Sequence, residues 1–378
     1  RDRARLLDHR NALVAARHPL ASWAEYWELG NRLGEARQDE LDAFYARWGG
    51  SYVEDRLRND WLLELGKRRD WANIARDFPR FRMNDDREVT CWWLFTEHLA
   101  GRDVADQARG LWFAQRDLDD GCNLLATALV DAKKLPVDDV YRKARLAIEQ
   151  QRPGAAKAAI GLLGNAAARD AAEAVDNPAR HLARGGSLGR HAQELRLLAV
   201  MRLAQTDAGA AAARLDDRNA RLHDTQAAWA WAYLARQSAF QLSADAAPQV
   251  LTALALLPTA HRDDLSPGWS DDTLAWGVRA LLRGAPPVQR WPAVARLIGW
   301  MSPAELRDPA WAYWRARATL ASARPGADGD AVLVTHAGVI RLLCAAHLKL
   351  PVEQWLEQPV AYAARVVLDL GRPESGDV

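Results

Sequence analysis

Histidines beside acidic residues are the first candidates for chemistry, because imidazole and carboxylate groups together bind metal ions or transfer protons. Two such places are His223-Asp224 and the segment HRDD at 261–264. Both lie at predicted turns with no cysteine or second histidine nearby, so we interpret them as solvated loop residues. The sequence also contains no G-x-x-x-x-G-K-[ST], G-x-G-x-x-G or H-E-x-x-H motif. We therefore expect no metal ion and no cofactor.

Tryptophan is the second residue type that could form a functional site, and it accounts for 17 of the 378 residues. A carbohydrate-binding protein would use some of these indole rings as stacking platforms, whereas a helical protein packs them between helices. Sixteen of them precede residue 325, and spacings such as Trp23 to Trp27 follow the face of a helix. We predict that most of these side chains pack between helices.

The elements that carry these residues are short amphipathic helices. In the segment 54–71, Leu57, Trp61, Leu62 and Leu65 form one apolar stripe at helical period. Further helices of three or four turns are predicted at 39–48, 87–101, 104–115, 122–134, 137–150, 192–205 and 225–237. None of these helices is stable alone, so each must pack against its neighbours.

Small clusters of turn-forming residues separate the predicted helices. They lie at 49–50, 100–103, 152–154, 184–190 and 284–287. Helix pairs joined by such turns stack into an α-solenoid, in the manner of degenerate TPR-like hairpins. The fold class predicted for residues 1–324 is therefore mainly α, a superhelical array of helical hairpins.

The pattern changes near residue 325. Residues 325–330 read as a linker, and 331–336 (AVLVTH) give the first clear strand signal. A helix is predicted from 337 to 350 and a second strand from 363 to 371. Residues 331–378 are thus expected to form a small α/β fragment of β-α-β type.

Residues 1–324 resemble the N-terminal, non-catalytic part of the soluble lytic transglycosylases, periplasmic enzymes that cleave peptidoglycan glycan strands. The resemblance is carried by the segments 18–29, 62–71, 140–148 and 309–318 and by the two cysteines Cys91 and Cys122. It implies a ring-like superhelix that guides glycan strands. In this family a separate lysozyme-like domain holds the catalytic acid, marked by Glu-Ser, Gly-Leu-Met-Gln and Ala-Tyr-Asn-Ala-Gly-Pro motifs. The last two do not occur here, and the one Glu-Ser pair, Glu374-Ser375, stands without them. We therefore expect no cleavage of glycan.

The C-terminal part resembles the end of the histidine phosphatases of the phosphoglycerate-mutase and α-ribazole-phosphatase type. The resemblance is carried by 332–351 and 359–371, and it makes His336 the second histidine of the phosphate pocket. The phospho-accepting histidine of an early Arg-His-Gly motif is missing, because Arg17-His18 is followed by Pro19. His336 is therefore the one catalytic candidate and is expected to be an orphan.

The cysteines differ between the two parts. Cys91 and Cys122 lie on candidate neighbouring helices and match two cysteines of the transglycosylase pattern, which implies a disulfide formed in the periplasm. Cys344 lies in an apolar helix of the phosphatase-like part, where a buried free thiol is expected.

Composition restricts the remaining function classes. A net charge of +1 disfavours nucleic-acid binding, and no apolar run is long enough to span a membrane. The first residues contain no signal-peptide core, so we expect a mature periplasmic protein, or a cytoplasmic one if the phosphatase interpretation holds. The favoured function is a non-catalytic peptidoglycan-binding scaffold. The alternatives are a histidine-phosphatase-type phosphomonoester hydrolase fragment and a generic α-solenoid that binds proteins, and the join fits a natural fusion, a shifted reading frame or an artificial chimera.

Overall fold

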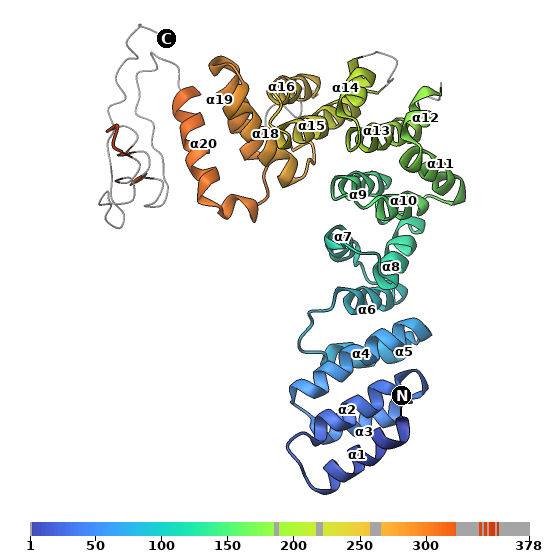
Figure 1. The fold of residues 1–378 in the computed structure, drawn as a ribbon. Helices are drawn as coiled ribbons and strands as arrows, with labels where there is room; N and C mark the ends of the chain where they lie inside the picture. Colours follow the sequence, from blue (N-terminus) through green and yellow to red (C-terminus); the bar gives the residue numbers. More distant parts are fainter. Residues whose placement is uncertain are drawn as a thin grey trace. The chain divides into compact units, whose positions relative to one another are not determined.

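The computed structural model describes residues 2–184, 189–216, 222–257, 266–322, 340–341, 344–345, 348–351 and 354. Every regular element within these ranges is a helix (Figure 1). The predicted mainly α architecture is therefore confirmed. The α/β fragment predicted for 331–378 lies almost entirely outside the described residues, as does the linker at 325–330.

The first of two compact units comprises residues 1–147 and 154–168. Within it, α1 packs on α2, α2 on α4, α4 on α5 and α6, and both α6 and α7 on α8. The helices are α1 (Arg3–Ala15), α2 (Ala21–Asn31), α3 (Gln38–Trp48), α4 (Tyr52–Arg68), α5 (Trp71–Asp77), α6 (Arg87–Leu99), α7 (Ala105–Ala114), α8 (Asp120–Asp131), most of α9 (Val137–Glu149), α10 (Pro153–Gly161) and the start of α11 (Asn165–Asp176).

The second unit comprises residues 148–153 and 169–378. Here α13 packs on α12, α14 and α15, α15 on α16 and α18, and α19 on α18 and α20. Besides the ends of α9 and α11, its helices are α12 (Pro178–Ala183), α13 (Arg190–Ala204), α14 (Ala208–Asp216), α15 (Asp224–Phe240), α16 (Ala246–Leu256), α18 (Asp271–Gly284), α19 (Pro287–Gly299) and α20 (Pro309–Ser322).

Helix α4 shows how the apolar pattern produces the core. Leu57, Trp61, Leu62 and Leu65 are all at most 1% exposed, as the stripe predicts. They belong to one cluster with residues of α2, α3, α5 and α6. The stripe is what anchors α4 to its neighbours.

The segment 54–71, read as continuous, contains a helix break. Helix α4 ends at Arg68, because Arg69 takes the left-handed conformation with φ 57°. Asp70 then accepts a hydrogen bond from the backbone N–H of Asn73 and starts α5 at Trp71. An arginine, rather than a glycine, thus takes the left-handed position that closes α4.

Capping side chains start several other helices. Ser51, Asp86, Asp119 and Ser270 each accept a backbone N–H three residues ahead, at the first turns of α4, α6, α8 and α18. Such caps satisfy N–H groups that the helix itself leaves unpaired. The predicted turn at 100–103 contains Gly101 at φ 82°, a conformation that glycine adopts without strain.

The Cys91–Cys122 disulfide predicted from the family resemblance is present. It joins α6 to α8, with the two Cα atoms 4.9 Å apart. Close packing surrounds it, because a Cβ on Gly121 would lie 2.7 Å from the carbonyl oxygen of Glu88. Cys344 is a free cysteine and is partly exposed, so the expected burial of its thiol is wrong.

Fifteen of the sixteen tryptophans before residue 325 are buried or half-buried. Trp61, Trp92, Trp112 and Trp229, for example, are all below 5% exposed. The prediction that most of them pack between helices is confirmed. Trp27 is the exception, at 52% exposed.

Candidate functional site

The catalytic candidate His336 lies outside the described residues, and so does the segment 261–264. His223 is described: it is an exposed residue at the start of α15, and its backbone N–H donates to Oε1 of Gln193 at 2.8 Å. Among the described residues, no three His, Cys, Asp or Glu side chains gather as metal ligands would. His223-Asp224 is therefore a helix start in this structure.

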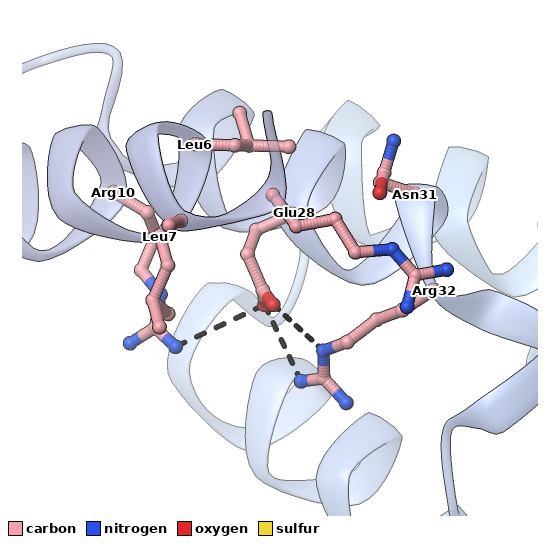
Figure 2. A pocket seen from close by; sticks show the side chains of 8 residues that line it. Leu6, Leu7, Arg10, Glu28, Asn31 and Arg32 are labelled. Carbon is pink, nitrogen blue, oxygen red and sulfur yellow. Dashed lines mark hydrogen bonds and ion pairs between the residues drawn. The ribbon is translucent and has the colours of Figure 1, made fainter. Parts of the chain in front are cut away.

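A hollow of about 400 Å³ lies between α1 and α2 (Figure 2). Its walls combine apolar side chains from α1 with charged and polar side chains from both helices. The residues that line it are Arg3, Ala4, Leu6, Leu7, Arg10, Glu28, Asn31 and Arg32. Three arginines in so small a space make it the obvious candidate for binding an anion.

The charges in this hollow are already paired. Figure 2 shows the guanidinium groups of Arg10 and Arg32 directed at Glu28, at 3.8 Å and 2.6 Å. Arg32 also pairs with Glu40 at 2.6 Å, and Arg3 pairs with Glu35 at 2.9 Å. An anion would have to displace a carboxylate from each arginine it contacts. Salt bridges therefore occupy the arginines of this hollow, and none of them is left without a carboxylate partner.

A second hollow, of about 500 Å³, lies among α11, α12 and α13. His191 lies beside Asp170, with Nε2 and Oδ2 3.9 Å apart, and Arg184 pairs with Glu173. Burial lowers the pKa of His181, which favours its neutral form. Arginine, histidine and carboxylate side chains all line this hollow, and ion pairs lie within it, as they do in the first hollow.

A buried carboxyl group lies at the end of α9. Glu149 accepts hydrogen bonds from Nε1 of Trp229 at 3.1 Å and from Oγ1 of Thr273 at 3.4 Å. Burial raises its pKa. A raised pKa is what a glycosidase needs in its general acid, but Glu149 is 5% exposed and its oxygens already bind α15 and α18. We interpret Glu149 as a packing group that ties three helices together.

Exposed aromatic rings form a surface feature on α2 and α4. Trp23 and Trp27 are one helical turn apart on α2, with ring centroids 6.0 Å apart, and the ring of Tyr52 on α4 lies 6.1 Å from that of Trp23. Trp27 and Tyr52 are 52% and 61% exposed, whereas Trp23 is half-buried against the core. We call Trp23, Trp27 and Tyr52 the aromatic strip.

Polar side chains lie alongside the aromatic strip. The hydroxyl of Tyr26 donates to Oδ2 of Asp60 at 2.7 Å, and Arg56 lies 3.9 Å from Oδ1 of the same carboxylate. Tyr52, Arg56 and Asp60 are spaced four residues apart, so they share one face of α4. Helical spacing alone put Trp23 and Trp27 on one face but did not show that Trp27 would lack a covering helix.

The described residues contain no helix long and apolar enough to cross a membrane. This accords with the absence of any such stretch from the sequence.

Two kinds of known protein resemble this chain. The histidine phosphatase superfamily (branch 1) matches residues 289–375, which is less than half of the chain. The match begins inside α19 and includes α20, so it overlaps the helical array that was predicted to extend to residue 324. No curated protein sequence matches.

Among solved structures, the chain is similar to an inactive mutant of the lytic transglycosylase Slt from Pseudomonas aeruginosa, at 20% identity and a TM-score of 0.50, over 93% of this chain and 58% of that one. A 70-kDa soluble lytic transglycosylase from Escherichia coli aligns over 92% of this chain and 63% of its own, at 14% identity and a TM-score of 0.44. At 20% identity the likeness to the Pseudomonas aeruginosa protein is one of fold. The chain spans about three-fifths of the length of these proteins.

Proposed function

We propose that this chain is a non-catalytic, peptidoglycan-binding scaffold of the soluble lytic transglycosylase type. The observation that supports it best is the fold likeness to a lytic transglycosylase over 93% of this chain. That likeness agrees with the sequence resemblance that the segments and cysteines of residues 1–324 carry. The expected behaviour is retention on peptidoglycan sacculi, which co-sedimentation measures.

Two described carboxyl groups, Glu88 and Glu149, have a raised pKa and are held in contacts between helices. Cleavage of a glycosidic bond needs a carboxyl of raised pKa beside the scissile oxygen. Burial raises the pKa of both Glu88 and Glu149. Glu149 is enclosed by its hydrogen-bond partners, and Oε1 of Glu88 accepts the backbone N–H of Gly121 at 3.3 Å beside the disulfide-linked helices. Neither group lines either of the two hollows.

A periplasmic location accords with the disulfide. Bonds such as Cys91–Cys122 persist in oxidising compartments and are rare in the cytosol. Blocking free thiols in intact cells, then reducing and labelling the rest, should label both cysteines only after reduction. Labelling of both before reduction would point to the cytoplasm.

The second candidate is a phosphomonoester hydrolase fragment, favoured by the histidine phosphatase match at 289–375. His336 would contribute to the phosphate pocket, but no matching nucleophile accompanies it in the sequence. We expect no hydrolysis of p-nitrophenyl phosphate. An activity that survives purification and falls in His336→Ala would favour this candidate.

We propose a domain boundary after residue 324, with a linker at 325–330 and a phosphatase-like fragment at 331–378. Limited proteolysis should then cut first between 324 and 330. A first cut between 284 and 289 would instead assign α19 and α20 to the phosphatase-like part, as the start of its family match allows.

A further inference from the structure

We propose that the aromatic strip of Trp23, Trp27 and Tyr52 is the surface that binds the sugar backbone of a glycan strand. This inference rests on the proposed function and assigns the surface at which the scaffold would bind glycan. The exposure of the rings, the polar side chains beside them and the balance of charge support it.

The exposure of the rings fits a stacking surface. A pyranose ring presents C–H groups on its faces and hydroxyl groups around its rim, so its face packs on an aromatic ring. Trp27 and Tyr52 are more than half exposed, and each ring lies beside that of Trp23, at centroid distances of 6.0 and 6.1 Å. Large side chains this exposed contribute little to the stability of the fold, and together they form an apolar surface available to a ligand.

The polar side chains beside the rings fit the hydroxyl rim of a sugar. Asp60 keeps acceptor capacity beyond the hydrogen bond from Tyr26, since a carboxylate accepts about four. The guanidinium of Arg56, with a side chain 44% exposed, supplies donors beside it. A sugar lying on the rings would therefore meet both acceptors and donors at one edge.

The charge balance favours an uncharged ligand. Arg56 and Asp60 lie 3.9 Å apart and cancel each other, so this surface has no excess of either sign. An anionic polymer such as nucleic acid would need unpaired cations. The hollow in Figure 2 is crowded with ion pairs and has no comparable row of rings.

The strip is also pre-organised. Trp23 and Tyr26 pack against the main core of the first unit, and α2 packs directly on α4. The ring centroids of Trp23 and Tyr26 are 5.7 Å apart in an edge-to-face arrangement. A rigid surface loses little conformational entropy when it binds, which favours affinity.

The test compares single substitutions on the whole protein. Trp27→Ala and Tyr52→Ala remove exposed rings, and Phe240→Ala is the matched control, because Phe240 is an aromatic residue that is 69% exposed on α15. Binding is measured to sacculi by co-sedimentation and to chitohexaose by calorimetry. We expect each strip variant to bind about fivefold or more weakly, as for other central aromatic contacts, and Phe240→Ala to bind as the unmodified protein does.

The outcomes separate this inference from the proposed function. If the unmodified protein binds sacculi and both strip variants bind equally well, the strip is not the glycan surface, while the proposed function stands. If the unmodified protein binds neither sacculi nor chitohexaose, both are wrong. Trp27→Phe retains a ring and should recover part of the affinity, and equal melting temperatures establish that the variants are folded.

Discussion

Cys91 on α6 and Cys122 on α8 are joined by a disulfide, with their Cα atoms 4.9 Å apart and a sequence separation of 31. The bond closes the loop that contains α7, and α6 and α8 also pack directly against each other. It is thus a covalent link across one of the helix contacts of the first unit.

Loss of this disulfide should destabilise the protein. On the chain-entropy model, a loop of this length stabilises the folded state by about 3 to 4 kcal/mol. Urea unfolding of a Cys91→Ala/Cys122→Ala variant measures the effect. Cys344→Ala is the control and should change little, because Cys344 is a free thiol. Equal midpoints for the double variant and the unmodified protein would show that helix packing alone holds this region.

Gly66 on α4 should not tolerate a side chain. Its Cβ would lie 2.4 Å from Nε1 of Trp92, inside the core of the first unit. We expect Gly66→Ala to destabilise the protein by about 1 to 3 kcal/mol, the usual cost of overpacking, as measured by thermal unfolding. Gly110→Ala, in α7 with nothing within 4 Å, should instead stabilise by about 0.5 to 1 kcal/mol. A neutral Gly66→Ala would contradict the close packing of α4 on α6.

Glu149 should make stability depend on pH. Its pKa is raised in the folded state, so its contribution to stability is full below the unfolded pKa of about 4.3 and is lost as pH rises through the folded value. Glu149→Gln cannot ionise, its amide oxygen can still accept from Nε1 of Trp229, and its NH2 group can donate to Oγ1 of Thr273. The variant should therefore lose less stability than the unmodified protein between pH 4 and pH 7, as measured by denaturant unfolding. If the stability of the variant and of the unmodified protein changed with pH in the same way, the pKa of Glu149 would not be raised in the folded state.

The sequence predicted the helices well because their apolar stripes are local signals. The stripe of Leu57, Trp61, Leu62 and Leu65 on α4 required only helical periodicity, and all four side chains are buried. The end of α4 was harder to predict, since Arg69 adopts a left-handed conformation that its residue type does not favour.

The candidate site was predicted less completely, because it depends on which helix faces remain uncovered. The spacing of Trp23 and Trp27 is the same whether both are buried or both are exposed. The burial of Glu149 depends on Trp229 and Thr273, which are 80 and 124 residues away in sequence. Periodicity within α9 carries no information about such distant partners.

Incubation of the purified protein with peptidoglycan sacculi tests the central claim most directly, with bound protein and released muropeptides measured in the same sample. We predict that the protein sediments with the sacculi and that no anhydro-muropeptides appear beyond those of a protein-free control. Failure to sediment, or release of anhydro-muropeptides that persists through repeated purification, would contradict the account of a scaffold that binds glycan strands without cleaving them.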